Sequence, residues 1–288
     1  MSIKTSSGPV CLITGGTDGV GKATATELAS RGFIVVITAR NLAKAESVKA
    51  EIKRATGAEV EVMSADLTSL QSVRKLAGTF TARYPRLDVL INNAGIFASK
   101  RVLTDDGFES SYQVNYLSHF LLTHLLIDRL KASEHGRIIN LSSSVYTAGK
   151  FDPQNLQSEK RFSVMGTYAA SKLFMLLFTV ELAERLKGTN VTSNAVHPGI
   201  VRTPMMLRAP GMFRVISYLA LPFSISPQKG AATSVHLASS PMVRQLSGLY
   251  FTDCKPAAIK TKFNTDTVRG ALWEKTAQSL RQLGLMNA

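Results

Sequence analysis

A single doubly wound α/β domain with a mainly parallel sheet is the fold that this 288-residue sequence predicts. Short uncharged apolar runs alternate with helical patterns, which is typical of strands buried on both faces of a parallel sheet. The first apolar run leads directly into a glycine-rich turn and a helix. No Pro/Gly/Ser-rich linker or charge run divides the chain, and 45% hydrophobic residues are enough for one large core.

The glycine-rich turn follows the first expected strand, which runs from Val10 to Ile13. Four glycines fall within seven residues between Gly15 and Gly21, and the helical pattern that follows stops at Gly32. Glycines in this context let the backbone approach a pyrophosphate, and the N-terminus of the helix offers N–H groups and the positive end of its dipole. We therefore expect a phosphate-binding turn here.

Two kinds of phosphate-binding turn compete for this segment. Gly16, Gly21 and Lys22 nearly form a nucleoside-triphosphate loop, but Ala23 stands where that loop needs a hydroxyl ligand for magnesium. The dinucleotide pattern G-x-G-x-x-G also fits poorly, because Thr24 replaces its last glycine. Without the metal ligand, ATP or GTP chemistry is disfavoured, and the spacing that the segment does contain is T-G-x-x-x-G-x-G.

The remaining elements follow in alternating order. Strands are expected at 33–38, 59–63, 87–91, 137–141, 191–196 and near 247–254, and helices at 42–55, before 84–85, at 107–129, after 166 and around 272–273. The second strand ends at Ala39 and Arg40, where an acidic residue would select NAD and a cation accommodates a 2′-phosphate. Arg40 favours NADP(H), and Asp18 in the glycine turn is a mild counter-signal.

Composition narrows the classes of partner. The formal net charge is +14, but the Lys and Arg residues are dispersed and no nucleic-acid-binding motif is present, so nucleic acid is not expected as a partner. Cys11 and Cys254 are far apart and show no metal-ligand spacing, so neither a disulfide nor a metal site is expected. No signal peptide or membrane span is recognisable. These features indicate a cytoplasmic protein.

Tyr168 and Lys172 carry the expected chemistry. Residues four apart share one face of a helix, and the apolar run that follows them would bury that helix. A neighbouring ammonium lowers the pKa of a phenol, which brings it into the range of general acid/base catalysis. Without further partners, however, the same spacing is equally that of an ordinary amphipathic helix.

Two further polar residues supply such partners. Ser143 follows the fifth expected strand, at the edge where parallel sheets place their ligands, although Ser142 is an alternative one residue away. Asn115 lies within an apolar helical pattern, where asparagine is unfavourable and therefore needs a reason. His119 and His124 on the same helix are interpreted as core or surface residues, because no carboxylate or thiol cluster accompanies them.

In this order, the glycine turn, the Asn92-Asn93-Ala94-Gly95 turn and the Tyr168/Lys172 pair resemble the short-chain dehydrogenase/reductase family, with its Rossmann fold. The interval of 25 positions between Ser143 and Tyr168, together with the segments 114–124, 196–199 and 247–254, is similar to its retinol dehydrogenase branch. The resemblance implies the catalytic set Asn115, Ser143, Tyr168 and Lys172. It implies cofactor contacts from the turns and strand ends around them: Gly15, Thr17, Asp18, Gly19, Val20, Gly21, Arg40, Asp66, Leu67, Asn93, Ala94, Gly95, Tyr168, Lys172, Pro198, Gly199, Val201 and Thr203.

Two segments are expected to shape the substrate site. An insert at about 145–164 is interpreted as an irregular lobe over the site, and the Met- and aromatic-rich stretch at about 204–226 as a substrate lid, with a pair of core helices as the alternative. Such walls suit an apolar substrate. Arg208 and Arg214 flank apolar residues, which is compatible with a peripheral membrane contact. Homo-oligomer formation is left open.

The expected activity is NADP(H)-dependent hydride transfer to or from a carbonyl or alcohol of an apolar substrate. A retinoid-like aldehyde or ketone is one candidate substrate. Tyr168 would donate the proton, Ser143 would bind the substrate oxygen, Lys172 would lower the pKa of Tyr168, and Asn115 would support proton resupply through a water. Three alternatives remain: a protochlorophyllide-reductase-like enzyme that reduces a C=C bond, a non-catalytic NADPH-binding scaffold, and a nucleoside-triphosphate enzyme that uses Lys22.

Overall fold

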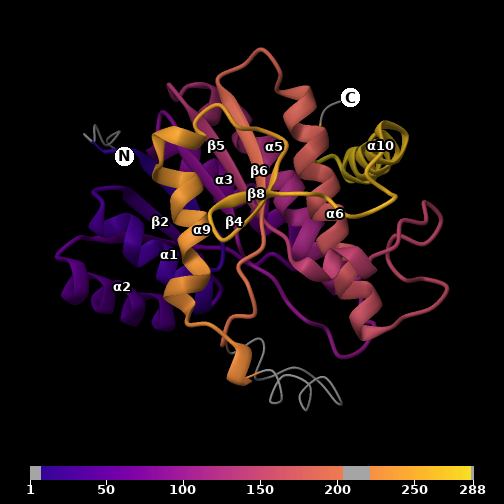
Figure 1. Cartoon of the computed structure of the whole chain (residues 1–288), viewed down its shortest axis with the longest axis horizontal. Helices are drawn as coiled ribbons and strands as arrows, with labels where there is room; N and C mark the ends of the chain where they lie inside the picture. Colours follow the sequence, from indigo (N-terminus) through magenta and orange to yellow (C-terminus); the bar gives the residue numbers. More distant parts are fainter. Residues whose placement is uncertain (1–7, 204–220, 287–288) are drawn as a thin grey trace.

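The computed structural model describes residues 8–203 and 221–286. One eight-stranded sheet runs through the molecule in the order β3-β2-β1-β4-β5-β6-β7-β8 (Figure 1). All neighbouring strands are parallel except β7 and β8. The strands are β1 Val10–Ile13, β2 Ile34–Ala39, β3 Val60–Ser64, β4 Val89–Asn92, β5 Gly136–Leu141, β6 Val191–Val196, β7 Tyr250–Thr252 and β8 Lys255–Ala257. The predicted doubly wound fold is confirmed.

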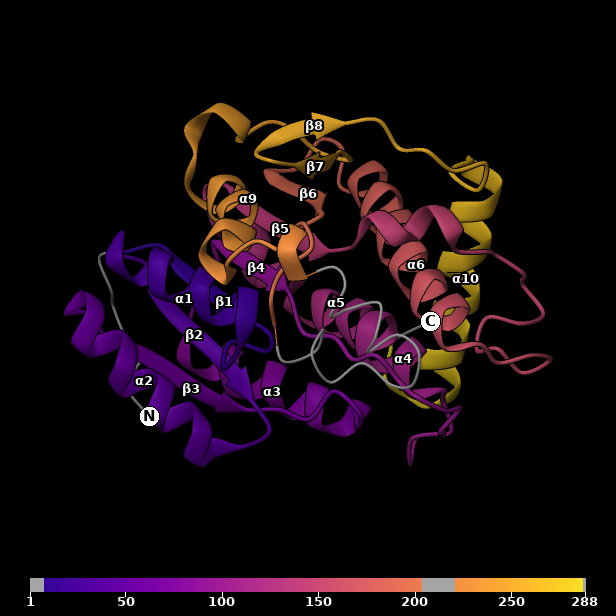
Figure 2. The same cartoon turned by 60° about the horizontal axis from the view of Figure 1, so that its bottom comes forward.

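Helices cover both faces of the sheet and give the molecule two apolar cores (Figure 2). On one face lie α1 (Gly19–Ser30), α2 (Leu42–Thr56) and α9 (Pro227–Ser239). On the other lie α3 (Leu70–Arg83), α5 (Ser118–Lys131) and α6 (Val164–Arg185), with α10 (Asp266–Gln282) packed outside α6. The central strands contact both cores, which is why they read as continuous apolar runs.

Side-chain caps set where several helices begin. The side chain of Asn41 accepts a hydrogen bond from Lys44 N, and Ser69, Ser163, Ser226 and Thr265 do the same for α3, α6, α9 and α10. Each such bond satisfies one of the N–H groups that a helix start leaves unpaired. The helix predicted at 42–55 is observed at Leu42–Thr56 and the one predicted after 166 begins at Val164, whereas α9 was not predicted.

The segment 107–129 differs from the single predicted helix. It consists of α4 (Ser110–Tyr112), a π-helical turn η1 (Gln113–Leu117) and α5. A π turn carries one extra residue within a helix and is often found at functional sites. It is here that Asn115 lies.

The closing strand also differs from its prediction. The segment 247–254 contains only the three-residue β7, and the chain then turns back into the antiparallel β8. Asp253 and Cys254 link the two strands with φ of 49° and 60°. Two consecutive residues with positive φ form the tight turn whose twist matches that of the strands it joins.

Of the two segments expected to shape the substrate site, the insert is described and most of the lid is not. Residues 145–163 contain the end of a 3₁₀ turn, η2 (Ser144–Ala148), followed by irregular turns, as expected. Residues 204–220 of the expected lid lie outside the described residues, and 221–226 contain the short 3₁₀ turn η3 (Leu221–Phe223). Among the described helices, none has both the length and the apolar character to cross a membrane.

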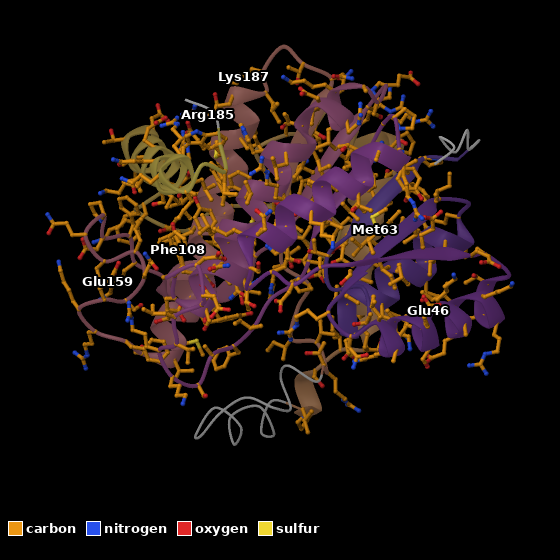
Figure 3. All side chains as sticks on the ribbon, turned by 180° about the vertical axis from the view of Figure 1, so that it is seen from behind. Glu46, Met63, Phe108, Glu159, Arg185 and Lys187 are labelled. Carbon is orange, nitrogen blue, oxygen red and sulfur yellow. The ribbon has the colours of Figure 1, made fainter. Side chains whose placement is uncertain are left out.

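Helix α10 completes the fold by covering α5 and α6. Trp273 packs edge-on against Phe120, with ring centroids 4.8 Å apart, and stacks on Phe178 at 5.9 Å. The guanidinium of Arg185, labelled beside this helix in Figure 3, lies 4.2 Å from the centre of the Trp273 ring. The predicted closing helix is thus confirmed, and it supports the helix that carries Tyr168.

Candidate active site

Helix α6 places Tyr168 and Lys172 side by side. The Nζ of Lys172 lies 5.6 Å from the centre of the Tyr168 ring and donates a hydrogen bond to the carbonyl oxygen of Leu141 at 3.0 Å. This bond ties the lysine to the carboxyl end of β5. The ring of Phe97 meets Tyr168 edge-on, with centroids 4.9 Å apart. The pair predicted from spacing is therefore held against the edge of the sheet.

Burial controls the ionisation of both groups. It raises the pKa of Tyr168 to about 12 and lowers the pKa of Lys172 to about 8. The direction for Tyr168 is opposite to the one expected from a neighbouring ammonium. A phenolate loses its hydration when buried, and this cost raises the pKa of Tyr168 more than the neighbouring lysine lowers it. The expected lowering of the Tyr168 pKa is therefore wrong for the protein groups alone.

The end of β5 presents two serines with different surroundings. The buried Ser142 hydroxyl donates to the carbonyl oxygen of Lys172 at 2.8 Å, which joins β5 to the middle of α6. The Ser143 hydroxyl is only partly buried, and its contact with the Val145 N–H is long, at 3.5 Å. Ser143 is thus the hydroxyl available to a ligand, and Ser142 has a structural bond.

Asn115 uses its side-chain amide within the protein. Its Oδ1 accepts from the N–H of Ile96 at 2.7 Å, and its Nδ2 donates to the carbonyl of Ile96 and to Ser171 Oγ, both at 3.0 Å. The residue is fully buried in the π turn. The amide therefore fixes the segment that leads to Phe97 and joins it to α6, and neither of its two hydrogens remains for a water.

The glycine turn fits a pyrophosphate. The N-cap residue of α1, Asp18, makes no side-chain capping bond, so the first N–H groups of the helix are not covered by it. Gly15 has φ of 67°, and a Cβ at Gly16 would lie 2.5 Å from the Ile37 side chain. A Cβ at Gly21 would clash with the Gly15 carbonyl oxygen. The turn is thus pressed against the sheet, and the helix N–H groups that Asp18 leaves uncapped suit an anion.

Three basic residues, Arg40, Lys44 and Lys22, lie after β2, on α2 and on α1. Arg40 is exposed at the end of β2, with no hydrogen bond or ion pair among the described residues. Lys44 on α2 pairs with Asp18. Lys22 instead pairs with Glu51 on α2, away from the turn, which does not support a role as a phosphate lysine. Because Lys44 pairs with the Asp18 carboxylate, Asp18 no longer argues against NADP(H).

Asp66 and Leu67 follow β3 at the same edge. The Asp66 carboxylate accepts from the N–H and hydroxyl of Thr68 at 2.9 and 2.8 Å, forming a local turn. The Leu67 side chain is buried, and its carbonyl accepts from the hydroxyl of Ser118 at 2.7 Å. Both residues thus lie at the carboxyl end of the sheet, as predicted, and α5 fixes their backbone.

The turn after β4 is fixed by Thr14. The Thr14 hydroxyl accepts from the N–H groups of Asn93 and Ala94 at 2.9 and 3.0 Å, and the Asn93 amide donates to the Thr14 and Gly15 carbonyls at 2.7 and 3.1 Å. The turn leading through Gly95 is thereby locked to the glycine turn. Sequence reasoning gave Thr14 no role of its own, although it heads the T-G pattern.

The turn after β6 leads to a segment that lies close to the start of α1. Gly199 has φ of 86°, and Val201 bridges in parallel to Ile225. A Cβ at Gly19 would lie 2.8 Å from Thr203 Cγ2. Thr203 therefore lies over the start of α1. The structure thus brings every predicted cluster to the carboxyl edge of the sheet: the glycine turn with Thr17 and Val20, the Arg40, Asp66 and Asn93 turns, the Tyr168 helix, and the segment from Pro198 to Thr203.

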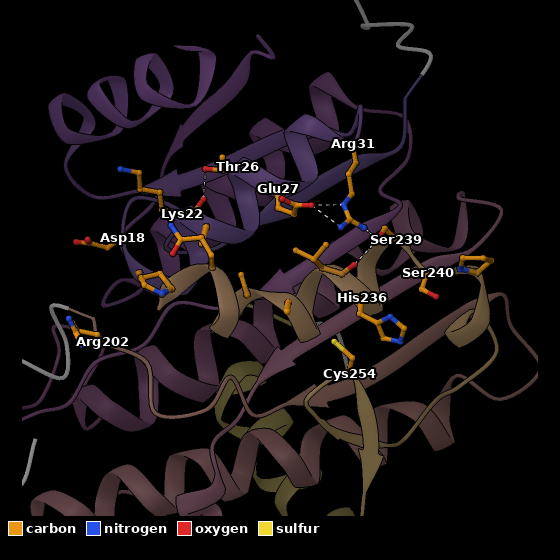
Figure 4. Close-up of a pocket in the computed structure, with 18 residues that line it drawn as sticks. Asp18, Lys22, Thr26, Glu27, Arg31, Arg202, His236, Ser239, Ser240 and Cys254 are labelled. Carbon is orange, nitrogen blue, oxygen red and sulfur yellow. Dashed lines mark hydrogen bonds and ion pairs between the residues drawn. The ribbon is translucent and has the colours of Figure 1, made fainter. Parts of the chain in front are cut away.

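A separate groove of about 880 Å³ lies between α1 and α9 (Figure 4). Arg31 crosses it and donates to Glu27 at 2.8 Å and to Ser239 at 3.0 Å. Of the predicted cofactor-binding residues, only Asp18 and Gly19 line this groove. This groove is therefore not the site around Tyr168.

Comparison with known proteins agrees with this geometry. A family model described as short chain dehydrogenase matches residues 9–210. Human retinol dehydrogenase 12 is 43% identical over 274 residues, covering 95% of this chain and 86% of that protein. Retinol dehydrogenase 14 of Mus musculus is 41% identical, covering 93% of this chain and 84% of that protein.

Solved structures show the same fold. A crystal structure of an uncharacterized protein from Mycobacterium Paratuberculosis has a TM-score of 0.77 at 30% identity, over 97% of this chain and 95% of that one. A short chain dehydrogenase from Shigella flexneri 2a, complexed with NADP, has a TM-score of 0.64 at 26% identity, over 84% of this chain and 95% of that one.

The chain is an α/β oxidoreductase of the nicotinamide-dependent, hydride-transferring kind. It belongs to the short-chain dehydrogenase/reductase family and is similar to retinol dehydrogenases within it.

Proposed function

We propose that the chain is an NADP(H)-dependent reductase or dehydrogenase that acts on a carbonyl or alcohol of an apolar substrate. The observation that carries the proposal is that Tyr168 lies beside Lys172, whose ammonium is bonded to the Leu141 carbonyl at the carboxyl end of β5, two residues before the available Ser143 hydroxyl. A bound nicotinamide dinucleotide supplies or accepts the hydride. The protein groups hold the substrate oxygen and exchange its proton.

Tyr168 is the proposed proton donor in the reduction direction. Its raised pKa keeps the phenol protonated at neutral pH, so that it can donate a hydrogen bond, and then a proton, to a developing alkoxide. Ser143 donates a second hydrogen bond to the same oxygen. Lys172, whose Nζ is held by Leu141, is placed to stabilise the phenolate that remains.

Asn115 is proposed to support proton resupply. Since both amide hydrogens are bound within the protein, its contribution through the side chain is structural: it fixes Ile96 and Ser171 around the Tyr168 helix. The water of the resupply route is assigned to the main-chain carbonyl oxygen of Asn115, which has a second lone pair beside the one that faces His119 Nδ1.

The preference for NADP(H) is supported by the charges at the adenosine end. Arg40 is exposed without a partner among the described residues, and Lys44 holds the Asp18 carboxylate. A 2′-phosphate carries charge that such cations bind favourably. The NADP complex of the Shigella relative is consistent with this preference. The names of the relatives, together with the aromatic wall that Phe97 forms beside Tyr168, favour an apolar, retinoid-like substrate.

The test is Tyr168→Phe, assayed by following NADPH oxidation with retinaldehyde, straight-chain aldehydes, steroid ketones and quinones. We expect kcat to fall by about 10² to 10⁴, the usual contribution of a positioned proton donor, with NADPH affinity largely retained. Tyr250→Phe is the matched control, because Tyr250 packs on Tyr146 away from Lys172. Turnover by Tyr168→Phe at the wild-type rate would contradict the proposal.

A further inference from the structure

His119 is a fully buried residue on α5 that uses both of its ring nitrogens. Its Nε2 lies 2.9 Å from the Thr14 hydroxyl, and its Nδ1 lies 3.3 Å from the Asn115 carbonyl oxygen. The ring therefore stands between the residue that fixes the cofactor turn and the residue that occupies the π turn. An apolar side chain could fill the same space without either contact. Burying an imidazole that has no hydrogen-bond partner would cost free energy.

The partners determine the tautomer. The Asn115 carbonyl can only accept, so Nδ1 carries the ring hydrogen and Nε2 is the acceptor. The Thr14 hydroxyl then donates to Nε2 at 2.9 Å in preference to the Ile91 carbonyl oxygen, which is farther away at 3.4 Å. Its oxygen in turn accepts from the N–H groups of Asn93 and Ala94. Four hydrogen bonds therefore run in one direction from the turn after β4 to Asn115, an arrangement in which each bond polarises the next.

The ring remains neutral at working pH. Burial lowers the pKa of His119 to about 3, and the nearby charge of Lys172 acts in the same direction. A second ring proton would also place a donor against the Thr14 hydrogen. The chain of bonds is therefore the same across the neutral range.

We propose that His119 is a positioning residue that couples the cofactor turn at Thr14 to the π turn at Asn115. At one end the imidazole orients the hydroxyl that holds Asn93 and Ala94, which the proposed function places against the cofactor. At the other end it fixes the carbonyl that the proposed function places in proton resupply. The inference rests on that function for its effect on catalysis, but the hydrogen-bond network itself does not.

Three substitutions of His119 test its bond to Thr14 and its bond to Asn115 separately. In His119→Gln the amide oxygen can replace Nε2 toward Thr14, whereas in His119→Asn the amide N–H can replace Nδ1 toward Asn115. His119→Phe keeps the volume and neither bond. His124→Phe, at an exposed position on the same helix, is the control.

We expect the dissociation constant of NADPH, measured by fluorescence titration, to rise about tenfold in His119→Phe and His119→Asn and to be largely restored in His119→Gln. We expect kcat to fall about tenfold in His119→Phe and His119→Gln and to be largely restored in His119→Asn. The control should match the wild type in both. The proposal would be overturned if the NADPH affinity and kcat of His119→Phe stayed within twofold of the wild type. It would also be overturned if all three variants lost affinity and kcat equally and in proportion to a fall in melting temperature.

The network is also testable without cofactor or turnover. ¹⁵N NMR of the ring nitrogens should report a neutral His119 with its hydrogen on Nδ1 between pH 6 and pH 8. A protonated ring, or a hydrogen on Nε2, would overturn the inference. A wild-type chain that shows this tautomer but binds no nicotinamide dinucleotide would instead contradict the proposed function and keep the network.

Discussion

The two serines at the end of β5 show how neighbouring residues of one type take different roles. Ser142 is buried and bound to the Lys172 carbonyl, whereas Ser143, the next residue, is partly exposed at the carboxyl end of β5. We expect Ser143→Ala to lower kcat by about 10² or more, since one donor to the reacting oxygen is lost. Its melting temperature should stay near that of the wild type.

Ser142→Ala is the matched comparison and should do the reverse. It removes a buried hydrogen bond, which lowers the free energy of unfolding by about 1 kcal/mol, and it should leave kcat nearly unchanged. Urea unfolding and steady-state kinetics on both variants make the distinction. If Ser142→Ala were the inactive variant, the hydroxyl that binds the substrate oxygen would be that of Ser142, one residue before the proposed Ser143.

At the scale of elements, the glycine turn depends on close packing between α1 and the sheet. A Cβ at Gly21 would meet the Gly15 carbonyl oxygen and the Asn93 amide, both of which are held by the Thr14 network. We expect Gly21→Ala to lower the free energy of unfolding by about 2 kcal/mol, as overpacking does, and to weaken NADPH binding more than tenfold.

Gly270 in α10 provides the control for that substitution. It also lies within a helix, but a Cβ there would have no neighbour within 4 Å. Gly270→Ala should therefore raise the free energy of unfolding by about 0.5–1 kcal/mol through helix propensity and leave cofactor affinity unaltered. Equal effects of the two substitutions on binding would mean that the packing of the turn is unimportant. Thermal melts and cofactor titrations give both quantities.

Elements with a local cause could be predicted from sequence. The buried strands, the glycine turn and the caps at Asn41 and Ser163 each follow from a few neighbouring residues. The π turn at Asn115 could not, because it depends on hydrogen bonds to Ile96 and Ser171, 19 and 56 residues away. Asparagine in an apolar helix was the only signal.

The candidate site shows the same division. Its residues were predicted from ordered motifs, and the structure places them at one edge. The direction of the Tyr168 pKa was not predicted correctly, because burial depends on the whole surroundings and spacing gives only the neighbouring charge. The role of His119 was also missed. It was interpreted as a core or surface residue, and its partner Thr14 is 105 positions away.

At the scale of the whole molecule, the active-site helix lies between two layers. One side of α6 faces the sheet, and α10 returns to cover the other through Trp273 and Arg185. Lys172 is buried on the side that faces the sheet, where its Nζ donates to the Leu141 carbonyl, although a charged lysine is costly away from water. The fold as a whole therefore bears an electrostatic cost for holding this cation beside Tyr168.

That cost makes the stability of the folded chain depend on pH. The pKa of Lys172 is lowered from 10.5 to about 8, so between these values the unfolded chain binds more protons than the folded one. The free energy of unfolding contributed by this residue therefore rises with pH across that window. In Lys172→Met the contribution is absent. The free energy of unfolding of the wild type, relative to Lys172→Met, should accordingly increase by roughly 2 kcal/mol from pH 7 to pH 9.5.

Comparing the two proteins isolates the lysine from other titrating groups. Burial also holds the Cys11 thiol protonated and raises the pKa of Tyr168 to about 12, and both effects lower stability at high pH. Cys11 and Tyr168 are present in both proteins, so their contributions cancel in the difference. Urea unfolding of the ligand-free proteins at half-unit pH intervals gives the curve. A difference that stays flat from pH 7 to pH 9.5 would mean that Lys172 keeps its ordinary pKa, and that water reaches the ammonium.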